Sequence, residues 1–129
     1  MKQVIVVGAG AAGIFAALAA SSRGAGVQLF EKNDIVGKKM GITGKGRCNL
    51  TNTAPMTDFI ARTPGHGKFL FSAYRAFSNE DLLRCVHQWG LATKEERGGR
   101  VFPRSDSAIE VRKLLYHRLQ KQHVELHLN

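Results

Sequence analysis

The sequence has few cysteines and no long uninterrupted hydrophobic run, and each shortage excludes a class of protein. Only Cys48 and Cys85 occur among 129 residues, and neither belongs to a C-x-x-C pair, which argues against a disulfide framework or a zinc ribbon. The apolar stretch near the N-terminus contains Gly8, Gly10 and Gly13, which would break the helix of a signal peptide or of a membrane span. We therefore expect a cytoplasmic protein without a membrane partner.

Acidic residues are also scarce, since 10 Asp and Glu stand against 19 Lys and Arg, which gives a formal net charge of +9. Such an excess suits a polyanion, but it also fits a simply solvated surface, because net charge governs solubility and steering rather than fold. The sequence has no recognition-helix motif, RNA-binding signature or evident exposed aromatics interleaved with the basic residues. We therefore expect a small-molecule partner and no nucleic acid, with a basic nucleic-acid-binding module as the less favoured alternative.

The order of apolar segments predicts an α/β fold within one domain. Residues 3–7 (QVIVV) and 27–31 (VQLFE) have the composition of buried strands, and the alanine-rich residues 14–22 between them predict a helix. Strand, glycine turn, helix and strand make a βαβ unit of the usual length. Residues 37–67 are rich in glycine without sustained periodicity, and we expect an irregular, functional loop there.

The second half of the sequence carries clear boundary signals. Ser78 to Asp81 (SNED) form a capping-box pattern that opens a helix ending near Gly90. Residues 91–96 and 100–103 flank two glycines and predict a hairpin, so a helical and hairpin insertion is expected at about 68–105. A second capping box at residues 107–110 opens another helix, and the sequence ends in an alternating strand, VELHLN.

The hexapeptide GAGAAG at residues 8–13 satisfies G-x-G-x-x-G, and each glycine has a physical reason. Gly8 permits a tight turn out of the strand, Gly10 lets backbone approach a pyrophosphate, and Gly13 lets helix and strand pack closely. The helix that follows offers free N–H groups and a partial positive charge to an anion. Glu31 ends the second strand, where a carboxylate accepts hydrogen bonds from ribose hydroxyls. This context favours an adenine dinucleotide over a purely structural glycine turn.

The stretch GKKMGITGKGRCNLTN, residues 37–52, combines basic side chains with glycines. Its first residues are expected to approach the same pyrophosphate, its middle glycines to let backbone amides lie against a flat ring, and its end to stand near the reactive part of the ligand. The alternative is a solvated basic loop. The residues of this stretch with expected ligand contacts are Gly37, Lys38, Lys39, Gly44, Gly46, Arg47, Cys48 and Asn49.

Four segments in this order, GAGAAG, GKKMGITGKGRCNLTN, SNED and GGRVFPRSDSA, resemble a bacterial FAD-dependent flavoprotein family. That family includes aminoacetone-oxidase-like proteins and 3-dehydro-bile-acid reductases. The resemblance implies a Rossmann-type FAD-binding domain, related to glutathione reductase, in which residues 43–49 line the isoalloxazine and Glu31 holds the ribose. Family members are much longer, so it also implies that residues 1–129 are the N-terminal part of the domain, that the fold is incomplete at its C-terminus, and that the missing part of the same protein is needed.

The expected function is that of an FAD-binding oxidoreductase acting on an unidentified small molecule, and the alternative is a truncated fragment that binds FAD partially without catalysis. No catalytic acid or base is evident, and whether NAD(P)H serves as reductant is left open. No metal is expected, because the alternation of His123, Glu125 and His127 fits a half-exposed strand. For Cys48 a packing role is favoured over a redox thiol. The candidate cofactor-binding residues are Gly8, Gly10, Ala11, Ala12, Gly13, Glu31, Lys32, Gly37, Lys38, Lys39, Gly44, Gly46, Arg47, Cys48 and Asn49.

Overall fold

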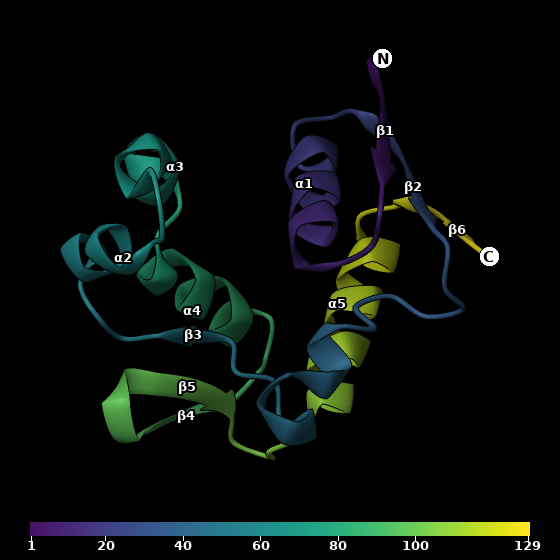
Figure 1. Ribbon diagram of the computed structural model, residues 1–129. Helices are drawn as coiled ribbons and strands as arrows, with labels where there is room; N and C mark the ends of the chain where they lie inside the picture. The colour runs from purple at the N-terminus through teal and green to yellow at the C-terminus, as the bar shows by residue number, and fades with distance from the viewer. The chain divides into compact units, whose positions relative to one another are not determined.

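A computed structural model describes all 129 residues, and the chain divides into two compact units (Figure 1). Unit 1 comprises residues 1–48 and 106–129, and unit 2 comprises residues 49–105. Unit 2 is therefore inserted, as one continuous stretch, into the chain of unit 1. No helix in either unit is both long enough and apolar enough to cross a membrane.

Unit 1 has the alternation of strands and helices that the sequence predicts. Its elements are β1 (Gln3–Val7), α1 (Ala11–Ser21), β2 (Gly26–Glu31), the 3-10 helix η1 (Met40–Gly46), α5 (Ala108–Lys121) and β6 (Glu125–Leu128). The strands form one parallel sheet in the order β1-β2-β6, with Val4 opposite Val27 and Leu29 opposite Leu126. This confirms the α/β fold of Rossmann type, including a third strand near the end of the sequence.

One face of this sheet forms the core of unit 1. Helix α1 packs on β1 and β2, and α5 packs against α1. Ala17 keeps the helix surface small where it meets the strands, so the backbones approach closely. The core side chains have at most 5% of their surface exposed, and they are Ile14, Ala17, Leu18, Val27, Leu29, Val111, Leu115 and Leu119. Burial of this apolar surface is what holds two helices and three strands together.

The opposite face of the sheet is open. Alternate residues of β1 point to it, and Ile5 and Val7 have 68% and 84% of their surface exposed. Phe30, which is paired with Val7 in the register of β1 and β2, is 39% exposed. Strand β1 also lies at the edge of the sheet, because its only partner is β2.

Unit 2 is an antiparallel sheet with short helices. Its elements are β3 (Thr51–Asn52), α2 (Met56–Arg62), the 3-10 helix η2 (Gly67–Leu70), α3 (Phe71–Ala76), α4 (Asn79–Gln88), β4 (Thr93–Glu96), the 3-10 turn η3 (Arg97–Gly99) and β5 (Arg100–Pro103). The strands pair in the order β3-β5-β4, so the predicted hairpin is confirmed. Its core contains Val86 of α4 with Leu91, Val101 and Phe102, all nearly inaccessible to solvent.

The predicted capping box at the start of α4 is also confirmed. Ser78 Oγ accepts a hydrogen bond from the backbone N–H of Asp81, and Asp81 Oδ2 accepts one from the backbone N–H of Ser78 at 2.8 Å. The bond from the Ser78 backbone N–H is the largest cause of a lowered pKa of the Asp81 carboxyl, followed by the bond that Ser78 Oγ donates to Asp81 Oδ2. At the start of α5, Ser107 Oγ accepts from the backbone N–H of Glu110 at 3.3 Å.

Two boundaries differ from the sequence prediction. The segment 37–67, expected as an irregular loop, contains η1, β3 and α2, and the expected insertion at 68–105 belongs to a unit that already starts at residue 49. Helix α2 has only seven residues and no buried side chain, so it lacks the apolar periodicity by which a helix is found in sequence. Helix α1 begins at Ala11, three residues earlier than the alanine-rich pattern suggests.

Substitution of Gly13 tests the close approach of α1 to β1. A Cβ placed there would lie 1.7 Å from the carbonyl oxygen of Gly8, which is backbone and has no room to move. We expect Gly13→Ala to destabilise the chain by about 3 kcal/mol through this clash. Gly10→Ala is the control, because a Cβ at Gly10 meets nothing within 4 Å. Equal thermal unfolding curves for the two variants would contradict the expected clash.

Candidate functional site

The N-terminus of α1 has no side-chain cap. Gly8 takes φ +97°, a conformation that favours glycine, and carries the chain from β1 into the turn. Gly10 is the N-cap residue and has no side chain to accept from the first N–H groups, and the first helical turn contains no acidic residue. Ala11 and Ala12 are exposed. The helix therefore presents N–H donors and the positive end of its dipole to an incoming anion.

Three hydrogen bonds bring the separate predicted segments together around Ala9, which is fully buried. Ala9 N–H donates to Glu31 Oε2 at 2.7 Å, and Ala9 O accepts from Gly37 N–H, also at 2.7 Å. Gly8 N–H donates to the carbonyl oxygen of Phe30 at 2.7 Å. The glycine-rich turn, the end of β2 and the start of the basic stretch are thus fixed to one another at a single residue.

The carboxylate of Glu31 is held by backbone donors. In addition to Ala9 N–H on Oε2, the backbone N–H of Asn33 and its Nδ2 donate to Oε1 at 2.9 and 2.6 Å. The Ala9 N–H is the largest cause of a lowered pKa of Glu31, followed by the Asn33 N–H. Because a carboxylate has about four lone-pair positions and three are used, Oε2 has capacity for one further donor, such as a hydroxyl group.

A cavity of about 370 Å³ lies at the carboxyl ends of the three parallel strands. In an open α/β sheet this is the end at which ligands bind. The rings of Phe30 and His127 stack with their centroids 4.3 Å apart and form a flat part of the wall. The residues lining the cavity are Val7, Gly8, Phe30, Glu31, Lys32, His127 and Asn129.

Phe30 and His127 line this cavity, although neither is among the predicted cofactor-binding residues. His127 is expected from the sequence only as a polar residue on a half-exposed strand, and its Nε2 lies 3.2 Å from Glu125 Oε1. The stacking arises because β2 and β6 pair in parallel with Phe30 opposite His127. An aromatic residue immediately before Glu31 can be recognised in the sequence as a candidate for the cavity wall. The residue that stacks on it can be identified only when the register of β6 is known.

The stretch after Gly37 folds into two tight turns rather than an extended loop. Lys38 and Lys39 are exposed, and Lys38 Nζ donates to Asn33 Oδ1 at 3.3 Å, which places one cation beside the Glu31 network. Within η1, Gly44 and Lys45 take φ +57° and +58°, so the helix is interrupted by a kink. These positive φ values explain a glycine at residue 44.

The last predicted site residues have local partners. Arg47 Nη1 lies 3.3 Å from Asp106 Oδ1, an ion pair within unit 1. Asn49 belongs to unit 2, where its amide nitrogen, oriented toward acceptors, donates to the carbonyl oxygens of Thr51 and Val101. Among the predicted residues, Glu31 and Gly37 therefore bond directly to the glycine-rich turn, both through Ala9, which is not itself among the predicted residues.

Cys48 is 3% exposed, and burial raises the pKa of its thiol. A redox-active cysteine needs an accessible thiolate, which a raised pKa disfavours. The only other cysteine, Cys85, lies on α4 in unit 2. These facts favour the packing role of Cys48.

A parallel sheet with an uncapped, glycine-rich helix start after β1 and a carboxylate at the end of β2 defines a dinucleotide-binding domain of the Rossmann class. The chain belongs to the HI0933-like family of FAD-binding Rossmann domains. The sequence model of this family, which is described as HI0933-like protein Rossmann domain, matches residues 2–129. The family contains flavoprotein oxidoreductases. The resemblance stated from the sequence motifs is thereby confirmed.

Two curated relatives match nearly the whole chain. A 3-dehydro-bile acid delta(4,6)-reductase from Clostridium scindens is 37% identical over 132 residues, covering 98% of this chain and 31% of the relative. A ribosomal RNA dihydrouridine synthase from Escherichia coli is 32% identical over 127 residues, with the same two coverages. The chain thus spans about a third of the length of these relatives.

A solved structure supports the fold. The crystal structure of Thermovibrio ammonificans THI4 superimposes with a TM-score of 0.60 at 16% identity, covering 99% of this chain and 38% of that chain.

The hydrogen bonds of Glu31 predict a pH-dependent stability. Its pKa is lowered from the ordinary value of 4.5, so its stabilising contribution is complete above pH 4.5 and is lost as the pH falls through the lower folded-state pKa. Glu31→Gln replaces one acceptor oxygen by a donor and should destabilise the chain by about 1 kcal/mol near pH 7. The difference in melting temperature between wild type and variant should shrink as the pH falls below 4.5 and Glu31 becomes protonated. A difference that stays constant across this range would contradict the prediction.

Proposed function

We propose that this chain is the cofactor-binding part of a flavoprotein that reduces a carbon–carbon double bond conjugated to a carbonyl group. The observation that carries the cofactor-binding part of this proposal is the arrangement around Ala9. It fixes the glycine-rich turn, Glu31 and Gly37 to one another beside an uncapped helix start. That arrangement has the donors for a pyrophosphate and a carboxylate oxygen for a ribose hydroxyl.

The residues present fit FAD. The first N–H groups of α1 would hold the pyrophosphate, and Gly10 leaves open space where a side chain would obstruct it. Lys38 and Lys39, both exposed, would offset the phosphate charge, and Glu31 Oε2 would accept from the ribose. Once reduced by a separate two-electron donor, bound FAD would supply the hydride for such a reduction.

The type of reaction is supported by what the two relatives are named for. A delta(4,6)-reductase acting on a 3-dehydro bile acid reduces double bonds conjugated to a 3-keto group. Dihydrouridine is uridine whose ring double bond, conjugated to a carbonyl, is saturated. The two names share this chemistry although the molecules differ, so we propose the reaction type for the longer protein of which this domain would be the cofactor-binding part. A small molecule is the first candidate substrate.

An absorbance spectrum of the purified chain tests the cofactor. After incubation with FAD and gel filtration, we expect bands near about 375 and 450 nm to elute with the protein. Gly10→Ala should unfold at the same temperature as wild type, yet retain much less flavin, because its Cβ enters the space opposite the helix N-terminus. Folded wild-type protein that retains no flavin, or a Gly10→Ala variant that retains as much as wild type, would count against the assignment.

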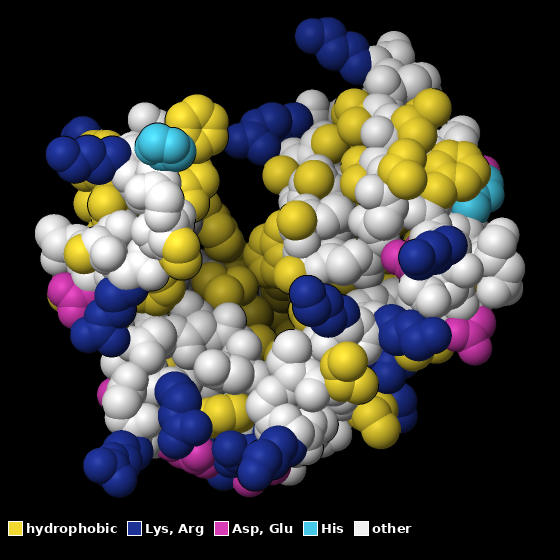
Figure 2. All heavy atoms as spheres, viewed as in Figure 1, with side chains coloured by type: hydrophobic (Ala, Val, Ile, Leu, Met, Phe, Trp, Pro, Cys, Tyr) yellow, Lys and Arg dark blue, Asp and Glu magenta, His cyan; other side chains and the backbone are white.

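RNA is a second candidate substrate, favoured by a surface of unit 2. Residues 56–77, here the basic-aromatic segment, contain α2, η2 and α3, with Asp58 as their only acidic residue. Phe69, Phe71 and Phe77 have 86%, 45% and 43% of their surface exposed. Hydrophobic and basic side chains lie together at the end of unit 2 that carries α3 (Figure 2).

The basic side chains of this segment, Arg62, Lys68 and Arg75, are exposed as well. The sequence interpretation that no exposed aromatics are interleaved with basic residues is therefore wrong for this part of the chain. Exposed aromatic rings stack on unpaired bases, and neighbouring cations bind the backbone phosphates. An RNA substrate would accordingly be single-stranded where it contacts this segment.

Binding of a fluorescein-labelled oligouridylate, followed by anisotropy at physiological salt, tests this candidate. The double variant Lys68→Ala/Phe69→Ala should weaken binding about tenfold through loss of one stacking ring and one cation. Lys113→Ala/Tyr116→Ala is the matched control, because it removes one exposed lysine and one exposed aromatic from α5. Equal weakening in both variants, or no binding by the wild-type chain, would exclude the basic-aromatic segment as an RNA site.

A further inference from the structure

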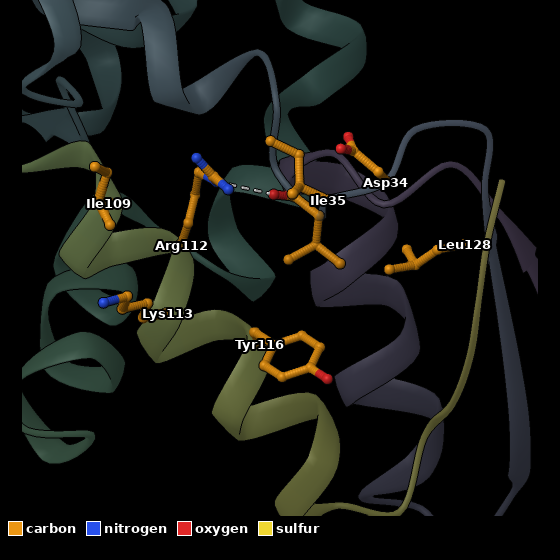
Figure 3. A pocket seen from close by; sticks show the side chains of 8 residues that line it. Asp34, Ile35, Ile109, Arg112, Lys113, Tyr116 and Leu128 are labelled. Carbon is orange, nitrogen blue, oxygen red and sulfur yellow. Dashed lines mark hydrogen bonds between the residues drawn. The ribbon is translucent and has the colours of Figure 1, made fainter.

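The peptide group between Val36 and Gly37 is hydrogen-bonded at both ends. Its carbonyl oxygen accepts from Arg112 Nε on α5 at 3.1 Å, and its N–H donates to the carbonyl oxygen of Ala9 at 2.7 Å. Figure 3 shows Arg112 reaching from α5 toward this turn. One peptide group therefore connects α5 with the glycine-rich turn.

The stem of Arg112 also packs along the turn that follows. A Cβ on Gly37 would come within 3.2 Å of Arg112 Cγ, and one on Gly41 within 3.4 Å of Arg112 Cδ. Gly37 has φ +65°, and the N–H of Gly41 donates to Gly37 O at 3.1 Å. The absence of side chains at both glycines lets the arginine lie directly against this backbone.

The charge of Arg112 strengthens this connection. A hydrogen bond from a cationic guanidinium to a carbonyl oxygen is stronger than one between neutral groups. It polarises the Val36–Gly37 peptide, so that the N–H at the other end becomes a better donor to Ala9. Val36 itself is 4% exposed, which limits competition from water on this side.

Arg112 borders a cavity of about 290 Å³ between α5 and the segment that follows β2 (Figure 3). Its walls are mainly apolar, from Ile35, Ile109, Tyr116 and Leu128. Lys113 lines the same cavity and is exposed, but no hydrogen bond joins it to the turn. Of two adjacent cations on one helix, Arg112 thus bonds to the turn and Lys113 does not, which makes Lys113 a control.

We propose that Arg112 is a positioning residue for the cofactor loop formed by Val36–Lys39. By fixing the Val36–Gly37 peptide, it sets the direction of Lys38 and Lys39 relative to the start of α1. The role toward a pyrophosphate rests on the proposed FAD site, whereas the ordering of the Gly37 N–H by Arg112 requires no ligand.

Amide hydrogen exchange of the ligand-free chain is the first test. Arg112→Met keeps an unbranched apolar stem but removes the donor and the charge, and exchange of the Gly37 N–H should accelerate about tenfold. Exchange of the β1 and β2 amides should stay unchanged. Arg112→Lys should restore part of the protection, since it keeps a cationic donor, and Lys113→Met should behave like wild type.

Ligand affinity is the second test, with ADP and adenosine as probes. Arg112→Met should bind ADP about tenfold more weakly and adenosine within twofold of wild type, because only ADP has the phosphates that face the loop. Unchanged Gly37 exchange in Arg112→Met, or an equal loss of affinity for both probes, overturns the proposal. If wild type binds neither FAD nor ADP, the proposed function fails, and the exchange rates still decide the ordering role of Arg112.

Discussion

The site in unit 1 depends on the hydrogen bonds of one buried alanine. The side chain of Ala9 is a methyl group that forms no hydrogen bonds. Its backbone N–H and carbonyl group nevertheless join the turn after β1 to Glu31 and to Gly37. Burial makes these bonds matter, because an unsatisfied backbone group inside the protein costs about 1–3 kcal/mol. The close contact of Gly13 with Gly8 contributes at the same turn. It fixes the position of α1 so that its first N–H groups face outward.

The charges around Ala9 form a connected network rather than isolated pairs. Lys38 donates to Asn33, and Asn33 donates to Glu31, so a cation, an amide and a carboxylate follow one another within hydrogen-bonding distance. A carboxylate close to an anion site would repel the anion, but here its charge is distributed over backbone donors and balanced by neighbouring lysines. The Glu31 carboxylate both holds the turn at Ala9 and leaves one lone pair for a ligand.

Much of the fold could be predicted because its signals are short. The spacing of Gly8, Gly10 and Gly13 specifies a turn and a helix start within six residues, and the SNED pattern specifies the start of α4. By contrast, the contact of Arg112 with Val36 joins residues 76 positions apart, and the stacking of Phe30 on His127 requires the register of a parallel pair. No local pattern encodes either. Helix α2 was missed for another reason, since a short helix with no buried residue has no apolar face to detect.

The insertion of unit 2 between two parts of unit 1 bears on how such a domain diversifies. Strands β2 and β6 pair although the whole of unit 2 separates them in sequence. The entropic cost of closing a loop rises by only about 0.6 kcal/mol when the length of the loop doubles. A sheet joined in this way therefore tolerates exchange or enlargement of the inserted unit at small thermodynamic cost. The same nucleotide cradle can accordingly be retained while the inserted segment, and whatever surface it offers, changes from one protein to another.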